Sequence, residues 1–366
     1  MKIQAAVARD IDGIFSVENV DLADPQPGEV LVRLVATGLC HTDYAIIEQI
    51  MPIPLPMVLG HEGAGIVERI GAGVEGLSPG DHVVMTFDTC GHCDECSHGH
   101  PSYCAEYMAR NFATRRPDGS PTIHDADGEA LGAVFFAQSS LATYCIARAS
   151  NTIKVREDAP LELLGPLGCG LSTGAGTVMN VLRPDKSHTI AVFGTGAVGM
   201  GALMAAKALG AGRIVAIDRV ASRLELAREL GATDTIDTSG VDLGEALESL
   251  GGIDFGVDTS GVPALIAAAT DALRQRGTLV LLGASKHQQV TLNVLPLISG
   301  KVIRGVTNGD IVPSQFIPRL VDMYMDGQFP LDRISSFYPL EQVNTALEDS
   351  LSGKTIKPII RMKPPL

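Results

Sequence analysis

A glycine-rich segment near the middle of the chain limits the possible folds more than any other feature. Residues 194–199 read Gly-Thr-Gly-Ala-Val-Gly, follow the apolar run Thr189–Phe193 and open a helical pattern. Asp218 ends the next apolar run about 20 residues later. Glycines at this spacing let the backbone approach a pyrophosphate at a helix N-terminus, where unpaired N–H groups favour anions. The segment therefore predicts a dinucleotide-binding fold.

The surrounding sequence supports this prediction, because short apolar runs alternate with helical patterns from about residue 171. The predicted strands are Thr189–Phe193, 213–217, 253–257 and 278–282, and the predicted helices are 198–209, 222–230 and 263–274. This alternation predicts an α/β fold with a doubly wound parallel sheet. Asp218 would accept hydrogen bonds from ribose hydroxyls and repel a 2′-phosphate, which favours NAD over NADP. The neighbouring Arg219 could partly offset that repulsion.

The first part of the chain has a different pattern, in which apolar and polar residues alternate. It predicts strands at Lys2–Ala8, 14–20, 30–36, 65–70 and 82–86, with a loop or hairpin over 111–140. No strand–helix–strand rhythm is present, so we expect a mainly antiparallel domain. The last part of the chain is too short to form the hydrophobic core of a third domain. Its predicted elements are two helices, 316–325 and 340–351, and a last strand, Lys357–Arg361. We therefore expect domains at 1–170 and 171–307, with 308–366 returning to the first.

The net charge disfavours two classes of binding partner, and the sequence shows neither a secretory signal nor a membrane span. The 366 residues carry a net charge of −14, which disfavours binding to nucleic acid or to an anionic membrane. Arg9 and Asp10 interrupt the N-terminus before a secretory signal could develop. The longest apolar run, 190–206, is shorter than the roughly 20 residues of a membrane span. We expect a soluble, cytoplasmic protein.

Four of the seven cysteines crowd into one short segment, which favours metal binding over disulfides in a cytosolic protein. They are Cys90, Cys93, Cys96 and Cys104. Four thiolates can close a tetrahedral zinc site without an open position, so we expect a structural zinc lobe over residues 88–106. A [4Fe–4S] cluster is the alternative. The nearby His92, His98 and His100 are expected to be solvated loop residues.

A second possible metal site is spread over three loops. It consists of Cys40, His61 and Cys169. One sulfur, one nitrogen and a second sulfur would leave one zinc position open for water or substrate, as in catalytic zinc sites. Spacing alone does not establish this site, because buried cysteines are usually inert. A lone histidine is likewise usually just hydrogen-bonded within the protein.

Taken together, these segments resemble the zinc-containing medium-chain alcohol dehydrogenases over essentially the whole chain. The resemblance rests on Gly60-His61-Glu62, the four-cysteine lobe, Cys169 and the glycine segment 194–199. Within that family, residues 34–43 and 163–170 are similar to the aryl-alcohol (benzyl alcohol) and geraniol-type dehydrogenases. The resemblance implies a GroES-like catalytic domain joined to a Rossmann cofactor domain.

The resemblance also implies roles for individual residues. Cys40, His61 and Cys169 would bind the catalytic zinc, which with the structural zinc makes two ions per chain. Glu62 would lie beside the zinc, and Asp43 would orient His61. Thr42 would bind the substrate oxygen and start a proton relay. The implied cofactor-binding residues are His41, Thr173, Gly194, Gly196, Gly199, Asp218, Arg223 and Lys357, and the implied substrate-pocket residues are Thr86, Phe87 and Phe136.

One position departs from the better-known liver-type enzymes of the family. Ala45 stands where those enzymes have the histidine that ends the proton relay. Either His41 or a chain of water molecules must then take the proton, and a histidine is suited to this because it titrates near neutral pH.

The predicted function is zinc-dependent oxidation of a primary aromatic or allylic alcohol to its aldehyde, with NAD. The alternatives of the same fold are a glutathione-dependent formaldehyde dehydrogenase, a short-chain aliphatic alcohol dehydrogenase and a zinc-free quinone or enoyl reductase. A non-catalytic NAD-binding protein and a zinc-ribbon interaction module are alternatives of another class. By resemblance we expect a homodimer or homotetramer that pairs through residues 290–306. Cys145 is expected to be a buried apolar residue.

Overall fold

The computed structural model describes residues 1–11, 13–283 and 289–363, and its internal contacts group the chain into two compact units. The first unit comprises Met1–Cys169, Val312–Met325 and Leu331–Leu366. The second unit comprises Gly170–Ile311 and Asp326–Pro330. None of the helices in the described residues has the length and apolar character that a membrane crossing requires.

The first unit contains a five-stranded sheet in the order β4-β1-β2-β7-β8. Its strands are β1 (Lys2–Ala8), β2 (Phe15–Leu22), β4 (Met57–Val58), β7 (Ile123–His124) and β8 (Ala130–Leu131). The predicted strand Lys2–Ala8 is confirmed, and it pairs antiparallel with β2 over its whole length. The predicted hairpin within 111–140 is also present, as β7 paired with β8.

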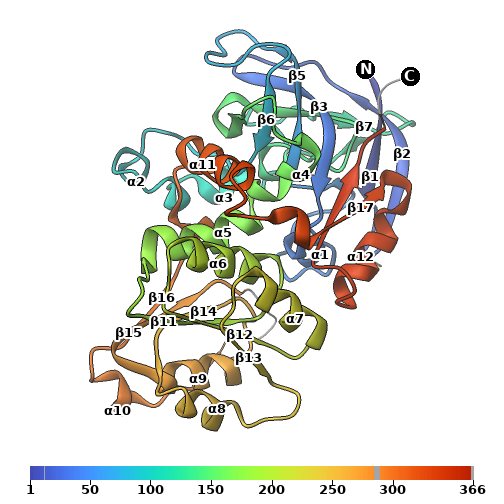
Figure 1. Cartoon of the computed structure of the whole chain (residues 1–366). Helices are drawn as coiled ribbons and strands as arrows, with labels where there is room; N and C mark the ends of the chain where they lie inside the picture. Colours follow the sequence, from blue (N-terminus) through green and yellow to red (C-terminus); the bar gives the residue numbers. More distant parts are fainter. Residues whose placement is uncertain (12, 284–288, 364–366) are drawn as a thin grey trace. The chain divides into compact units, whose positions relative to one another are not determined.

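A second sheet of the first unit has the order β10-β6-β5-β3-β18-β17, with β9 also paired to β3. Its strands are β3 (Glu29–Gly38), β5 (Glu62–Ile70), β6 (His82–Met85), β9 (Tyr144–Arg148), β10 (Thr152–Lys154), β17 (Ser335–Pro339) and β18 (Lys357–Arg361). The C-terminal β18 pairs antiparallel with β3 of the first unit, and the neighbouring β17 lies in the same sheet (Figure 1). Cys145 is buried on β9, with its sulfur 3.6 Å from that of Met85, as expected for a core residue.

Short helices and turns connect these strands. The α-helices of the first unit are α1 (His41–Ile47), α2 (Asp94–Ser97), α3 (Tyr107–Asn111), α4 (Leu161–Leu164), α11 (Pro313–Met325) and α12 (Val343–Leu351). The 3₁₀ turns are η1 (Pro101–Tyr103), η2 (Phe135–Ala137), η3 (Ala149–Asn151), η4 (Gly165–Gly168), η7 (Leu331–Ile334) and η8 (Leu340–Gln342). Helix α11 begins three residues before its predicted start, because the fixed φ of Pro313 suits the first turn of a helix.

The second unit contains a six-stranded sheet in the order β13-β12-β11-β14-β15-β16, and every neighbouring pair is parallel. Its strands are β11 (Thr189–Phe193), β12 (Arg213–Asp218), β13 (Asp234–Asp237), β14 (Ile253–Asp258), β15 (Leu273–Leu281) and β16 (Val302–Gly305). Its helical segments are α5 (Gly170–Gly176), η5 (Thr177–Leu182), α6 (Ala197–Ala208), α7 (Ala221–Leu230), α8 (Leu243–Ser249), α9 (Pro263–Ala272), α10 (Val294–Leu297) and η6 (Asn308–Asp310). The predicted doubly wound parallel sheet is confirmed (Figure 1).

Several elements of this unit were missed by the sequence patterns, among them β13 and α8. Each of these two is short and buries a single side chain, Ile236 in β13 and Leu247 in α8. Such segments have no clear apolar period. The predicted helix 263–274 was too long, because Leu273 instead starts β15 and pairs with Ile253 of β14.

Candidate active site and metal centres

Three loops of the first unit bring the predicted zinc ligands together. Cys40 precedes α1, His61 precedes β5, and Cys169 follows η4. One ligand atom from each of these residues, together with a carboxylate oxygen of Glu62, forms a group in which all atoms lie within 4.8 Å of one another. Two sulfurs and one imidazole nitrogen at this separation can bind one zinc ion and leave a further position open.

Asp43 fixes the orientation of the His61 ring. Its Oδ1 lies 3.1 Å from His61 Nδ1 and also accepts the backbone N–H of Gly60 at 2.9 Å. Its Oδ2 accepts the backbone N–H of Cys40 at 3.0 Å. Because a carboxylate oxygen accepts hydrogen bonds, His61 Nδ1 carries a proton, and Nε2 is the nitrogen that remains for a metal ion. The buried Nε2 has no hydrogen-bond partner in the described residues, so the donor set fits a metal ion.

The pKa shifts of this donor set indicate which protons a bound metal ion would displace. Burial opposes a charge on His61, but Asp43 and Cys40 outweigh it and hold the pKa of His61 well above its usual value. A hydrogen bond between the two thiols lowers the pKa of Cys40 and raises that of Cys169. A metal ion would therefore displace protons from His61 and Cys169.

Lys357 has a partner that the sequence did not predict. Its ammonium is buried and donates to Glu62 Oε2 at 2.8 Å, to Glu62 Oε1 at 3.0 Å and to the carbonyl oxygen of Leu39 at 3.2 Å. The pairing of β18 with β3 brings this side chain beside Glu62. These contacts join the ammonium to one carboxylate and one carbonyl oxygen, and the predicted pyrophosphate contact of Lys357 stays a prediction.

Burial and the neighbouring charges act against each other on both members of this pair. Burial raises the pKa of Glu62 to about 7, although the Lys357 charge acts in the opposite direction. Burial also opposes the charge on Lys357, but Glu62 and Cys40 outweigh it and raise the pKa of Lys357. The ammonium therefore stays charged. Gly38 leaves room for the carboxylate, since a Cβ there would lie 2.0 Å from Glu62 Oε2.

A strained segment, residues 134–139, packs against His61. Phe136 stacks on the imidazole with ring centroids 4.6 Å apart, and Phe135 meets it edge-on at 5.3 Å. Four non-glycine residues here have left-handed backbone conformations: Val134, Phe136, Ala137 and Ser139. Such conformations cost about 1–3 kcal/mol each and persist only where surrounding contacts impose them. We call this segment the left-handed loop.

Two buried amides hold the left-handed loop in place, and the sequence patterns pointed to neither. Gln138 donates to the carbonyl oxygen of His61 at 3.0 Å and accepts the backbone N–H of Gly63 at 3.1 Å. Asn151 donates to the carbonyl oxygens of Phe136 at 2.8 Å and Thr86 at 2.9 Å. Both amides act through backbone groups brought close only by folding, so no motif marks them.

The three residues predicted to line the substrate pocket have different surroundings. Phe136 contacts His61, as described above. Thr86 is fully buried, and its hydroxyl donates to the carbonyl oxygen of Gly168 at 2.6 Å, next to Cys169. Phe87 is buried against Tyr107 with ring centroids 5.9 Å apart. The hydroxyl of Thr86 thus positions the backbone before Cys169, and its place in a substrate pocket stays a prediction.

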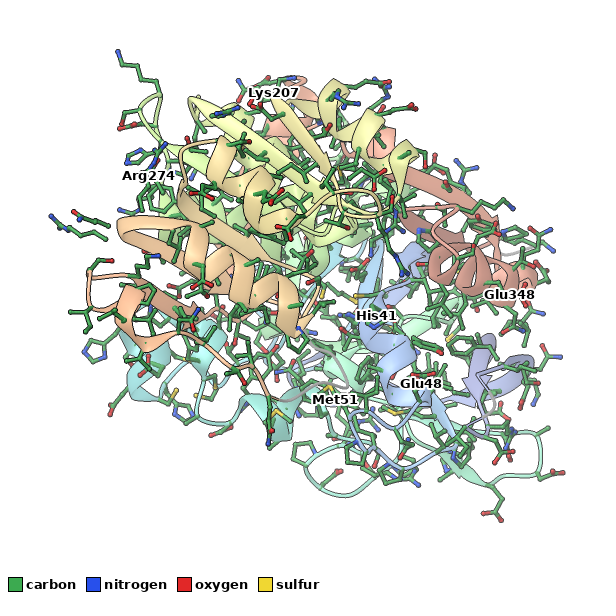
Figure 2. The ribbon with its side chains drawn as sticks, turned by 90° about the horizontal axis from the view of Figure 1, so that it is seen from below. His41, Glu48, Met51, Lys207, Arg274 and Glu348 are labelled. Carbon is green, nitrogen blue, oxygen red and sulfur yellow. The ribbon has the colours of Figure 1, made fainter. Side chains whose placement is uncertain are left out.

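The predicted relay residues lie at the start of α1. The Oγ1 atom of Thr42 is 3.7 Å from Cys40 Sγ, so this hydroxyl lies beside the metal-donor group. His41 is exposed at the first position of the helix, whereas Glu48 follows its last turn (Figure 2). Ala45 is buried and has no titratable group.

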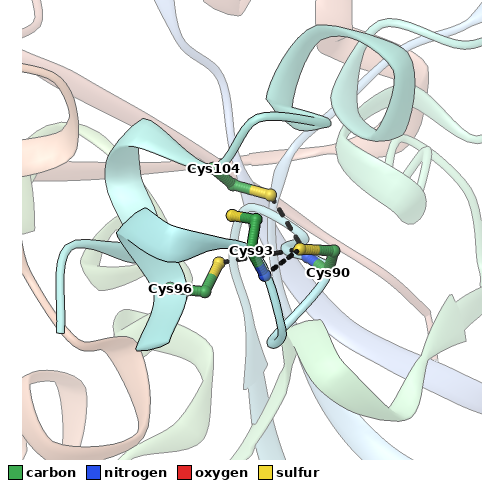
Figure 3. Close-up of side chains that lie close together, drawn as sticks. All are labelled: Cys90, Cys93, Cys96 and Cys104. Atoms are coloured by element: carbon green, nitrogen blue, oxygen red, sulfur yellow. Dashed lines mark hydrogen bonds between the residues drawn. The ribbon is translucent and has the colours of Figure 1, made fainter. Parts of the chain in front are cut away.

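The four cysteines of the predicted structural site converge around η1 and α2 (Figure 3). They are Cys90, Cys93, Cys96 and Cys104, with ligand atoms all within 4.8 Å of one another. The Cys90 and Cys96 sulfurs are 3.9 Å apart, close to the edge of about 3.8 Å expected for a tetrahedron with 2.3 Å zinc–sulfur bonds. A four-iron cluster would hold its thiolates farther apart, so the geometry favours zinc. His92, His98 and His100 are exposed, as expected.

Backbone N–H groups donate hydrogen bonds to the cysteine sulfurs of this site and so stabilise their thiolate forms. The Ala105 N–H donates to Cys93 Sγ at 3.4 Å, and this bond helps to lower the pKa of Cys93 to about 6. The Cys93 and His92 N–H groups donate to Cys90 Sγ at 3.3 and 3.5 Å. Burial raises the pKa of Cys96 to about 12. A metal ion would supply the charge that makes this fourth thiolate stable.

The glycine segment of the second unit forms the turn between β11 and α6. Gly194 has a φ of +91°, and a Cβ on Gly199 would lie 1.9 Å from the carbonyl oxygen of Gly194. A Cβ on Gly196, by contrast, would meet nothing within 4 Å. This open side at the N-terminus of α6 fits the approach of a cofactor pyrophosphate.

The other predicted cofactor residues of this unit lie on neighbouring elements. Asp218, at the end of β12, accepts the Thr195 N–H and hydroxyl, each at 2.7 Å. Arg223 lies on α7, and its Nε is buried without a hydrogen-bond partner in the described part of the chain. Thr173 lies on α5 and accepts the Thr177 hydroxyl at 2.8 Å through its carbonyl oxygen. The unpartnered Nε of Arg223 is a donor that a bound dinucleotide could use.

Comparisons with known proteins agree with these two units. A family described as "Alcohol dehydrogenase GroES-like domain" matches residues 26–157, and "Zinc-binding dehydrogenase" matches residues 197–324. The geraniol dehydrogenase of Castellaniella defragrans is 42% identical over 98% of this chain and 97% of its own length.

Two solved structures are similar to this chain over nearly its whole length. A zinc-binding alcohol dehydrogenase domain protein from Burkholderia ambifaria has 50% identity and a TM-score of 0.97, with 100% of both chains covered. Benzyl alcohol dehydrogenase from Acinetobacter calcoaceticus has 43% identity and a TM-score of 0.95, with 99% of this chain and 100% of that one covered. The predicted pairing of a GroES-like domain with a Rossmann-like domain is thereby confirmed. The chain belongs to the zinc-containing medium-chain alcohol dehydrogenases.

Proposed function

We propose that the protein oxidises a primary aromatic or allylic alcohol to its aldehyde, with a catalytic zinc ion and with NAD as hydride acceptor. One observation carries the zinc assignment, namely the convergence of Cys40, His61 and Cys169 around the unpartnered Nε2 of His61. The names of the two relatives, a geraniol dehydrogenase and a benzyl alcohol dehydrogenase, support the substrate class. The position of the Asp218 carboxylate at the end of β12 supports NAD over NADP.

Residues of the first unit would prepare the substrate for this reaction. When bound, zinc lowers the pKa of an alcohol, and NAD accepts the hydride. Thr42 would accept the proton of the substrate hydroxyl, because its own hydroxyl lies beside Cys40. His41 would release that proton to solvent from the exposed start of α1. Phe135 and Phe136 cover two sides of His61 and would keep water from its imidazole ring.

We further propose two zinc ions per chain, one at the Cys40 site and one at the four-cysteine lobe. The reduced state of all seven cysteines fits a protein that works in the cytoplasm. We also propose that the protein forms a homodimer or homotetramer. Val294, Leu295 and Ile298 are 72%, 79% and 76% exposed, and they lie in and beside α10, near the edge strand β16. Exposed apolar side chains beside a sheet edge indicate an interaction surface.

A turnover panel tests the proposed reaction. Benzyl, cinnamyl and geranyl alcohols should be oxidised faster than ethanol, and NAD should be preferred to NADP. A preference for ethanol would favour the short-chain alternative. Formaldehyde oxidation that requires glutathione would favour a glutathione-dependent formaldehyde dehydrogenase.

A Cys40→Ser variant tests the metal assignment. Its zinc content should fall from about two ions per chain to about one, and turnover should be lost. NAD binding should persist, because the predicted cofactor loop lies in the other unit. A variant that keeps its activity would contradict a catalytic role for Cys40.

A further inference from the structure

A cavity of about 360 Å³ in the first unit is lined by arginines that the proposed reaction does not use. Four of its lining residues are Arg110, Arg115, Arg116 and Arg148, and Glu106 is the only acidic residue among those that line it in the described chain. We call it the arginine cavity. Four arginines in one cavity contrast with the net charge of −14 of the whole chain. The volume is within the range of small-molecule sites.

One of the four arginines is already neutralised. The buried Arg116 donates to both carboxylate oxygens of Glu29, at 2.9 and 2.8 Å. It also donates to the carbonyl oxygens of Pro121 and Asp24, at 3.3 and 3.0 Å. Arg116 therefore forms a wall of the cavity and has little capacity for a ligand.

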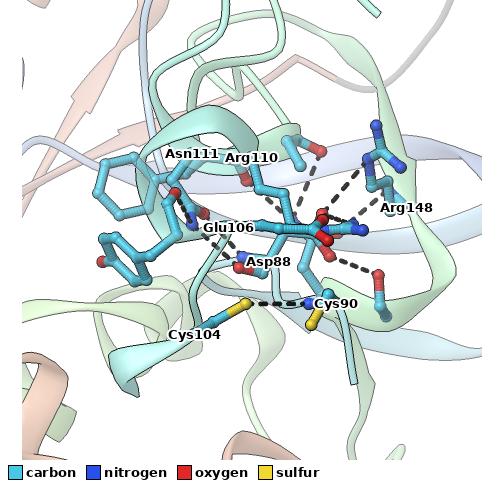
Figure 4. A network of polar contacts seen from close by, with 12 residues as sticks. Asp88, Cys90, Cys104, Glu106, Arg110, Asn111 and Arg148 are labelled. Carbon is cyan, nitrogen blue, oxygen red and sulfur yellow. Dashed lines mark hydrogen bonds and ion pairs between the residues drawn. The ribbon is translucent and has the colours of Figure 1, made fainter. Parts of the chain in front are cut away.

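The three remaining arginines share two carboxylates. Arg110 and Arg148 both reach the buried Asp88, at 2.9 and 3.4 Å (Figure 4). Arg110 also pairs with Glu106 at 2.8 Å. Within the described residues, Arg115 donates to two backbone carbonyl oxygens and no others, those of Ala130 and Leu131, at 3.2 and 3.4 Å. Three guanidinium groups thus face two carboxylates, which leaves one positive charge in excess at the cavity.

Donors for a ligand remain on these side chains. A guanidinium carries five N–H donors. Arg148 makes a single ion pair through Nε, and its two Nη groups have no partner among the described residues. Arg115 uses its two Nη groups on carbonyl oxygens and keeps its Nε. The other walls include apolar side chains, namely Ala109, Ala113 and Val134.

We propose that the arginine cavity binds a small organic monocarboxylate. The carboxylate would be held by Arg115 and Arg148, because a planar guanidinium matches the geometry of a carboxylate. The apolar body would rest against Ala109, Ala113 and Val134. A single excess charge balances a monoanion, whereas a dianionic phosphate would be left with an unpaired charge. None of the cavity's lining residues is one of the seven predicted zinc ligands, and the proposal does not depend on the proposed reaction.

Calorimetric titration of the zinc-loaded protein with benzoate tests the proposal. Wild-type protein should bind benzoate saturably at constant ionic strength, and it should not bind the neutral benzamide. Arg115→Gln should weaken binding about tenfold or more, as the loss of a charge-assisted hydrogen bond implies. Arg33→Gln is the matched control, because Arg33 is a half-buried arginine paired with Glu68 outside the cavity. Its affinity should equal that of the wild type.

A second variant keeps the test decisive if Arg115→Gln does not fold. Glu106→Gln removes a partly exposed negative charge from the cavity wall and frees a donor of Arg110, so it should tighten benzoate binding. Unchanged affinity in this variant would overturn the proposal. So would an absence of saturable binding to the wild type, or equal affinities in Arg115→Gln and Arg33→Gln. Benzoate bound instead at the Cys40 site would be insensitive to Arg115 and would likewise overturn it.

Discussion

Replacing Lys357 with methionine should destabilise the first unit by an amount that depends on pH. The substitution removes the charge but keeps most of the side-chain volume. It leaves the buried Glu62 carboxylate without the ammonium that lies 2.8 and 3.0 Å from its two oxygens. It also removes the donor to the carbonyl oxygen of Leu39. Lys357 is 2% exposed, so water cannot replace these contacts.

The pKa of Glu62 determines the size of the effect. Below pH 7 the carboxyl is largely protonated, since burial raises its pKa to about 7, and the loss should be about 1–3 kcal/mol for the unsatisfied polar groups. Above pH 7 the wild type holds an ionised pair. The variant must instead keep a proton on Glu62, because its pKa rises further without Lys357. The difference should therefore grow by about 1.4 kcal/mol per pH unit, towards about 3–5 kcal/mol.

Urea unfolding followed by circular dichroism at pH 6 and pH 8.5 measures this difference. A chelator should be present, because a metal ion beside Glu62 would lower its pKa. Lys354→Met is the matched control. Its ammonium lies 2.9 Å from Asp349, but the side chain is 72% exposed, so the variant should lose less than about 1 kcal/mol at either pH. The reasoning would be refuted if the Lys357→Met variant lost the same free energy of unfolding at both pH values. It would also be refuted if that loss were no greater than the loss in Lys354→Met.

Three further outcomes are expected. Asp43→Asn should lower zinc affinity at the Cys40 site about 10–100-fold, because the amide no longer fixes the proton on His61 Nδ1; unchanged affinity in a chelator competition would contradict this. Gly199→Ala should weaken NAD binding about tenfold or more without loss of zinc, since its Cβ would lie 1.9 Å from a carbonyl oxygen; an unaltered Kd would show that the turn adapts. Zinc affinity at the Cys40 site should fall about a hundredfold for each pH unit of acidification, because zinc binding must release one proton from His61 and one from Cys169, whose pKa values are both raised. A plot of log affinity against pH that indicates release of less than one proton would contradict this.

Motifs whose residues lie close together in the chain were predictable from the sequence. The four cysteines span residues 90–104, and the glycine segment follows its strand directly, so local spacing alone determines which atoms can meet. The parallel sheet was predictable for a related reason, since alternating apolar runs and helical periods permit few topologies. The contact between Asp43 and His61 was expected from the family resemblance, and the structure contains it.

The partner of Lys357 could not be predicted in this way. It is Glu62, 295 residues away in the chain, and the two meet only because β18 pairs with β3. The left-handed loop could not be predicted either, because its conformation depends on hydrogen bonds that Gln138 and Asn151 make to backbone groups far away in the chain. The sequence by itself therefore determined which chemical groups this protein possesses and which neighbours share a motif. Only the tertiary structure decided which distant groups are buried together, because burial and pairing depend on contacts that local preferences do not encode.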